Sequence, residues 1–197
     1  LVQKRSFTAN GTPGSNKLKF INDQTNLYTF AGFGIDGQML NDYNELNSKV
    51  ESRFLKLFTE GPLGYIITAI FMSIPRVLKR GYKIQIKVKS KSDYYYIDPA
   101  RGDMMISKPA GIVYEGPALF FGCSSIPCMG SKFKAFPFTG FTPDRFFQIR
   151  IANLNPLRVL FNMVPFWKGT YRNPKLLDFF VKDLEVEVDE IEQLMQG

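Results

Sequence analysis

The period of the apolar positions changes near residue 81 and divides the chain into a helical stretch and a strand-rich stretch. Over 39–58, apolar residues recur every three or four positions, which is the spacing of an amphipathic helix. Residues 63–80 are apolar on most sides and end in two basic residues followed by a glycine, which predicts a second helix. Pro75 lies inside this run and predicts a kink or a break.

Beyond residue 81 the period is two. Apolar residues alternate with lysine and glutamine over 82–89, which predicts a half-buried strand with a solvated basic face. Further strands are predicted by short apolar or alternating runs at 104–106, 111–114, 118–123, 147–151 and 184–188. Short strands separated by glycine, proline and serine are typical of an antiparallel sandwich or barrel. The predicted fold class is therefore α+β, mostly β.

The remaining segments connect these elements. We expect a loop or hairpin tip over 4–17, a short strand over 18–21, a turn over 22–26 and a strand over 27–33. Residues 90–101, which include three consecutive tyrosines, are expected to form a loop. Asn155 and Pro156 stand in the order of a helix N-cap and first helical residue, so a helix is expected over 157–166.

The segment 30–37 is the candidate centre of the chain, because it places three glycines and Asp36 between a predicted strand and a predicted helix. Such a junction can bring the backbone close to a ligand. The spacing of Gly32, Gly34 and Gly37 also matches the dinucleotide fingerprint. That interpretation needs one crossover helix followed by a parallel strand, whereas a second helix follows here. A dinucleotide-binding oxidoreductase therefore ranks below the interpretation that follows.

The composition excludes several kinds of catalysis and metal binding. The 197 residues contain no histidine, which excludes Ser-His and Cys-His catalysis and histidine-ligated metals within this chain. Cys123 and Cys128 are too few for a zinc site and are expected to be free thiols in a reducing compartment, with a local disulfide as the alternative. The net charge of +7 suits anionic partners such as phosphates or acidic membrane surfaces, and no nucleic-acid partner is expected because no such motif is present.

Two further features concern targeting. The apolar run 62–75 is shorter than the roughly 20 residues that span a bilayer. The polar start of the chain is not a signal peptide, and because it lacks Met we expect the sequence to be a fragment.

Four segments, taken in order, resemble motifs of the diacylglycerol kinase and sphingosine kinase family of lipid kinases. Residues 30–37 resemble its Gly-Phe-Asp-Ala type of segment, and residues 61–65 with the apolar helix after them resemble its leucine-glycine and alanine-tyrosine helix. Residues 118–144 resemble its block of glycine, proline and aspartate motifs, and residues 167–171 stand where the family has a Gly-His pair. The agreement in order runs from about residue 18 to about residue 190.

The sequence differs from the family pattern at two motifs and lacks one of the family's lobes. Arg145 rather than glycine follows Asp144, and Thr170 and Tyr171 replace the usual histidine. The family's nucleotide-binding lobe, with its Gly-Gly-Asp-Gly-Thr loop, is missing from these 197 residues, as are its closing strands. The resemblance thus implies that residues 1–197 form one C-terminal, lipid-binding lobe, an antiparallel β-sandwich with inserted helices that makes one wall of a kinase cleft.

The activity that this resemblance implies is transfer of the ATP γ-phosphoryl group to a hydroxyl of a diacylglycerol or sphingoid lipid, with Mg²⁺, in a full-length parent protein. The lobe alone is expected to bind neither ATP nor Mg²⁺ and to be inactive. The expected partners are the lipid substrate, the missing nucleotide-binding lobe and, peripherally, a membrane surface facing the cytoplasm. Whether the protein also forms a homodimer stays open.

The resemblance also assigns candidate site residues. Asp144 is the candidate catalytic acid, near the metal and the phosphates, and Asp36 is the acid that meets the polar head of the lipid. Gly34 and Arg53 complete the candidate substrate-binding residues. Each has an ordinary alternative, since Asp36 suits a helix cap, Asp144 a turn and Arg53 a solvated helix face.

A rival class is a non-catalytic β-sandwich that binds lipid or a membrane surface. The positive charge and the 19 phenylalanines favour it. The apolar side chains of the predicted helices either line an acyl-chain pocket or form ordinary core.

Overall fold

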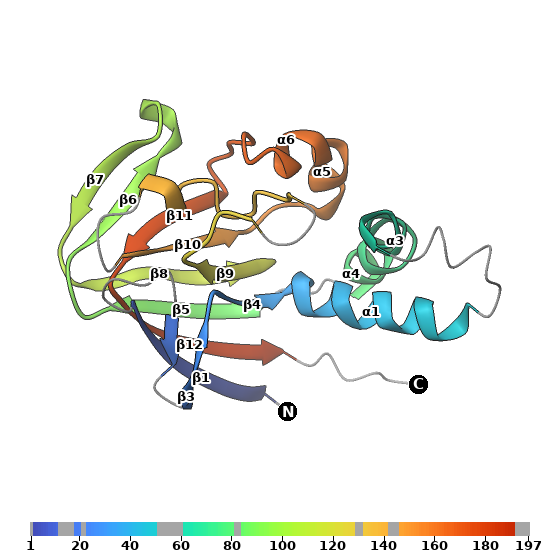
Figure 1. The fold of residues 1–197 in the computed structure, drawn as a ribbon, viewed down its shortest axis with the longest axis horizontal. Coiled ribbons are helices and arrows are strands. Elements are labelled where there is room, and N and C mark those ends of the chain that lie inside the picture. Colours follow the sequence, from blue (N-terminus) through green and yellow to red (C-terminus); the bar gives the residue numbers. More distant parts are fainter. Residues whose placement is uncertain are drawn as a thin grey trace.

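The computed structural model describes residues 2–11, 18–20, 23–50, 61–80, 84–128, 132–141 and 146–191. The strands in these ranges form two six-stranded sheets, which stack to make an antiparallel sandwich (Figure 1). Every strand pairing in the described ranges is antiparallel. The predicted α+β, mostly β sandwich with inserted helices is confirmed.

The first sheet, sheet A, collects both ends of the described chain. Its strands in spatial order are β3 (Asp23–Tyr28), β2 (Leu18–Phe20), β1 (Val2–Gly11), β12 (Asp183–Ile191), β5 (Ile84–Ser90) and β8 (Gly111–Ala118). The second sheet, sheet B, has the order β4 (Phe30–Gly34), β9 (Phe120–Ser124), β10 (Phe147–Ala152), β11 (Leu176–Val181), β6 (Tyr94–Asp98) and β7 (Met104–Lys108).

The main core lies between the two sheets. In β5 and β12 the apolar positions of the alternating pattern face inward, and Val88 and Val186 are fully buried. From sheet B, Phe121, Phe147 and Ile149 meet them and are also fully buried. The charged positions of β5 and β12 face outward and pair across the strands, as in Lys89 Nζ to Glu187 Oε1 at 2.7 Å. The alternation read from the sequence is therefore an inside–outside pattern.

The central strands of sheet B, β9, β10 and β11, are buried on both faces, although the alternation over 147–151 is typical of a strand with one polar face. All six residues of β10 are buried. The outer face is covered by residues 132–141, here called the cover segment, and by the short helices α5 (Pro156–Phe161) and α6 (Met163–Trp167). In Figure 1, α5 and α6 lie over this sheet, on the side away from sheet A.

A buried ion pair stands at the centre of the covered face. The side chains of Arg150 and Asp178 are only 5% and 6% exposed, and two N–H groups of Arg150 donate to Asp178 at 2.7 and 3.0 Å. A third donates to the carbonyl of Ala135 in the cover segment at 2.6 Å. Gln148 donates to Asp178 at 2.6 Å and accepts from the Phe138 amide at 3.0 Å. The network therefore binds the cover segment to the sheet at two points.

A helical insertion leaves the sandwich after β4. It consists of α1 (Ile35–Lys49), α3 (Gly61–Thr68), the π-helical turn η1 (Ala69–Ser73) and α4 (Ile74–Arg80). Figure 1 shows these helices projecting from one end of the sandwich. The π turn ends at Ser73, two residues before Pro75, which lacks the N–H that a regular helix requires, so the predicted irregularity takes the form of a widened turn.

The two arms of this insertion are joined by a buried acid. Asp42 of α1 is 1% exposed and accepts from Ser73 Oγ at 2.8 Å and from Gln38 Nε2 at 2.7 Å. Arg76 of α4 pairs with Asp42 and, at 3.0 Å, with Glu45. An aspartate taken from water is tolerated here because it is fully hydrogen-bonded and paired.

Several local expectations were wrong, and pairing partners explain those that concern strands. Residues 2–11 form β1 rather than a loop, because they pair with β12 over nine consecutive positions. The expected turn at 22–26 is largely part of β3, and the tyrosine triplet expected in a loop starts β6 between β11 and β7. The expected helix 157–166 is interrupted at Asn162, between α5 and α6.

The two cysteines are free, as expected. Cys123 in β9 lies in the core between the sheets, and burial raises the pKa of its thiol from 9.0 to about 12. Cys128 is only partly buried. The two thiols therefore differ sharply in access to solvent.

We predict that replacement of Asp178 by Asn destabilises the protein by about 3 to 5 kcal/mol, because it leaves Arg150 buried without a counter-charge. Urea unfolding measures this loss. Replacement of Glu115 by Gln is the matched control: its pair with Lys87 at 3.0 Å is exposed, so the change should cost less than about 1 kcal/mol. Equal losses for the two variants would contradict the prediction.

For the thiols, we expect iodoacetamide at mildly alkaline pH to modify Cys128 alone in the native protein, and both cysteines in denaturant. Mass spectrometry of tryptic peptides reads this out. The raised pKa of Cys123 also predicts that stability falls as pH rises from 9.0 toward about 12, because the unfolded thiol ionises first. Modification of Cys123 in the native state would show that the core is open.

Candidate functional site

The glycine segment forms the corner at which β4 turns into α1. Gly34 has φ of +98°, a conformation that other residues rarely adopt, and the next amide, of Ile35, donates to the Leu119 carbonyl at 2.9 Å. A Cβ on Gly34 would lie 2.3 Å from that carbonyl oxygen. The close approach that this glycine permits is thus to the chain's own backbone, and its predicted substrate contact stays a prediction.

A glycine on the neighbouring strand, Gly122, makes room for aromatic rings. Gly32 of β4 pairs with Gly122 of β9, and a Cβ on Gly122 would lie 2.6 Å from the Phe120 ring and 2.8 Å from the Phe136 ring. Phe136 is fully buried and its ring lies 5.7 Å from that of Phe30. The absence of a side chain at Gly122, opposite the glycine segment, therefore serves aromatic packing under the cover segment.

The structure describes the predicted site residues Asp36, Arg53 and Asp144 only in part. Asp36 lies in the first turn of α1, and the structure describes its backbone but not its side chain. Arg53 and Asp144 lie outside the described residues.

Phe146, the described residue nearest to Asp144 in the sequence, is not close to the glycine corner. Through β9, the register places Gly34 level with Ala152 at the end of β10. Phe146 precedes the other end of β10. It is six positions before Ala152, which in an extended strand corresponds to roughly 20 Å. The structure thus does not bring this flank of Asp144 to the corner that carries Asp36.

The corner also lacks the geometry of a dinucleotide site. β4 is the edge strand of sheet B and pairs antiparallel with β9. Among the described elements, the next one along the chain after α1 is helix α3, not a parallel neighbouring strand. The dinucleotide fingerprint depends on a parallel βαβ unit, so the oxidoreductase interpretation gains no support.

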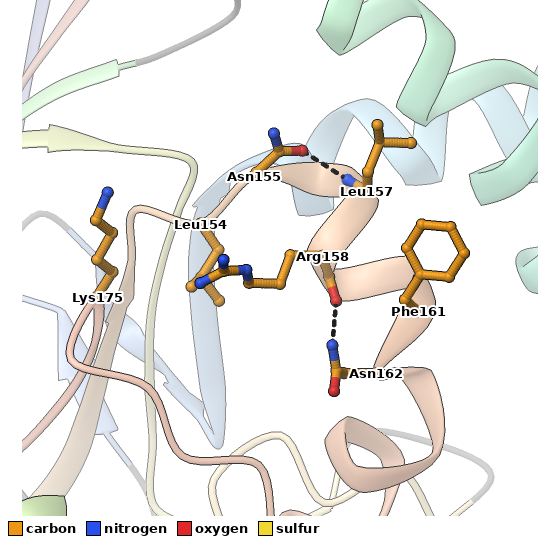
Figure 2. A pocket seen from close by; sticks show the side chains of 7 residues that line it. All are labelled: Leu154, Asn155, Leu157, Arg158, Phe161, Asn162 and Lys175. Carbon is orange, nitrogen blue, oxygen red and sulfur yellow. Dashed lines mark hydrogen bonds between the residues drawn. The ribbon is translucent and has the colours of Figure 1, made fainter.

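A hollow lies elsewhere, beside α5 (Figure 2). It has a volume of about 470 Å³. Its lining residues are Leu154, Asn155, Leu157, Arg158, Phe161, Asn162 and Lys175.

The chemistry of this lining is basic and apolar. Arg158 and Lys175 are cationic, and no acid lines the hollow. The side chain of Asn155 caps α5 by accepting from the Leu157 amide at 2.9 Å, as its position before Pro156 predicted. Sequence reasoning identified the cap but missed the hollow, because Lys175 comes from a separate segment that the fold brings beside α5.

Two features are absent from the described residues, a cluster of metal ligands and a helix that could span a membrane. In the described part of the chain, no group of three or more cysteine, aspartate or glutamate side chains is placed to hold a metal ion. None of the described helices is both long and apolar enough to cross a membrane.

Comparison with known proteins identifies no family for this chain. No protein-family model matches the chain, and no curated protein sequence matches it significantly.

The glycine corner generates a paired prediction. Replacement of Gly34 by Ala should destabilise the protein by at least about 1 to 3 kcal/mol, because the residue meets Leu119 in a left-handed conformation. Replacement of Gly37 by Ala should instead be neutral or stabilise by up to about 1 kcal/mol, since nothing lies within 4 Å of the added Cβ. Thermal unfolding of both variants checks this, and equal effects would refute the geometry of the corner.

Proposed function

We propose that this chain is the C-terminal lobe of an ATP-dependent lipid kinase of the diacylglycerol or sphingoid class. The observation that carries the proposal is the agreement between two independent features. The ordered motifs from residue 30 onward resemble that family, and the fold is the antiparallel sandwich with inserted helices that the resemblance implies. In particular, the helical insertion leaves the sandwich directly at the glycine segment.

In the proposed reaction the protein contributes position and charge. A carboxylate accepts the proton of the lipid hydroxyl as that oxygen attacks the γ-phosphorus, and ADP leaves. Asp144 is proposed for this role, and Asp36, Gly34 and Arg53 for binding the lipid head; the described flank of Asp144, at Phe146, lies roughly 20 Å along β10 from the level of the glycine corner. A second lobe, with a glycine-rich phosphate loop, would hold ATP and Mg²⁺.

The proposed location is peripheral, at a membrane surface facing the cytoplasm. The lipid substrate resides in a bilayer, and the chain carries a net charge of +7, which attracts it to anionic headgroups.

The test compares the 197-residue chain with the full-length protein of its reading frame, using ATP, Mg²⁺ and diacylglycerol or sphingosine in mixed micelles. We expect phosphorylated lipid from the full-length protein and none from the chain alone. Replacement of Asp144 by Asn should lower kcat by at least about a hundredfold, whereas replacement of Asp36 by Asn should raise KM.

Two results would overturn parts of this proposal. Turnover by the chain alone would show that no second lobe is needed. A full-length protein that phosphorylates neither lipid would remove the kinase assignment. An active Asp144→Asn variant would remove the catalytic role of Asp144 while leaving that of Asp36 open.

A further inference from the structure

Large apolar side chains are exposed at the end of the molecule formed by α5 and α6. Phe161 at the end of α5 is 84% exposed, Val164 in α6 is 64% exposed, and Leu157 is also exposed. Helix α4, which lies against α5, adds exposed Leu78, and the π turn before it adds Phe71, 73% exposed. Single exposed apolar residues are ordinary, but several on adjoining helices indicate a surface that binds something.

The exposed residues belong to an ordered part of the protein. The rings of Phe166 and Tyr171 stack with centroids 4.4 Å apart, and Trp167 packs on Phe133 of the cover segment at 5.3 Å. The Lys134 amide also donates to the Trp167 carbonyl at 3.0 Å. Because α6 is held against the cover segment in this way, Val164 is presented outward by a supported helix, and Phe161 lies on α5, which contacts that helix.

Positive charge lies directly beside these apolar residues. Arg158 follows Leu157 on α5, and in Figure 2 its side chain extends along the hollow toward the segment of Lys175, while Phe161 points to the opposite side. Within the described residues, neither cationic head group has an ion-pair partner, and no acid lines the hollow. The surface therefore combines exposed hydrocarbon with unneutralised positive charge.

We propose that this surface docks on an anionic lipid bilayer. Phe161 and Val164 enter the acyl-chain region, and Arg158 and Lys175 bind headgroup phosphates at the level of the hollow. Charge complementarity favours this occupant, because a bilayer with acidic lipids presents phosphates immediately above hydrocarbon, in the same order as these side chains. The proposal deepens the peripheral location proposed above, but it concerns binding alone, so it can fail or hold independently of kinase activity.

The experiment is sedimentation of the 197-residue chain with vesicles of phosphatidylcholine, with or without phosphatidylserine. We expect binding only to the vesicles that contain phosphatidylserine. Replacement of Arg158 or Lys175 by Gln should each weaken binding about fivefold, and replacement of Phe161 by Ala about tenfold.

Matched controls come from the other end of the sandwich. Lys108 on β7 and Ile112 on β8 are also exposed, and the hairpin of β6 and β7 lies at the left of Figure 1, away from α5 and α6. The variants Lys108→Gln and Ile112→Ala should bind as the unchanged chain does. Unaltered thermal unfolding of all five variants shows that the effects are not due to misfolding.

The single tryptophan gives a site-specific readout. Trp167 is the last residue of α6, so lipids brominated on their acyl chains should quench its fluorescence when α6 docks. Binding without quenching, or binding that the control variants weaken equally, would place the docking surface elsewhere and overturn the proposal. Failure to bind the acidic vesicles would overturn it too, as would a dimer in solution that Phe161→Ala converts to a monomer.

Discussion

The pair of Arg150 and Asp178 is the interaction on which the covered face of sheet B depends. Both side chains are buried, and a charge removed from water is tolerated only when its partners satisfy it. Here each guanidinium and carboxylate group is bonded within the network, and Gln148 and Ala135 extend it to the cover segment. The pair therefore does more than join β10 to β11, because it also determines where the cover segment lies.

The cover segment in turn supports the end of the molecule that we assign to the membrane. Its Lys134 amide bonds to Trp167, and a Cβ on Gly169 would lie 2.8 Å from Pro137 and 3.0 Å from Lys134. The ion pair, the cover segment and α6 thus form one continuous set of contacts, at whose outer end Val164 is exposed. At the edge of the same sheet that β4 forms, the corner at Gly34 begins the helical insertion. A kinase lobe organised in this way would present its lipid-facing elements from one rigid sheet.

The sequence predicted those elements whose apolar residues alternate with polar ones, run together between turn residues, or recur at helical spacing. The alternation in β5 and β12 was recognised because one face of sheet A meets solvent, and the cap at Asn155 was recognised from its chemistry. Strand β11 was missed because it is buried on both faces and carries Asp178 in the middle of an apolar run. Strand β1 is polar along its length and is a strand only through its pairing with β12, a partner far away in the sequence. For the same reason, the hollow at Lys175 could not be read from local pattern.

The buried pair is tested most directly by a double-mutant cycle in which Arg150 is replaced by Met and Asp178 by Leu, followed by urea unfolding. Each single replacement should destabilise the protein by about 3 to 5 kcal/mol, because it leaves one buried charge alone. The double replacement should cost much less than the sum, with a coupling of at least about 2 kcal/mol. Losses that add to within about 0.5 kcal/mol would show that the two charges do not act together, and the cover segment would then be held by something else.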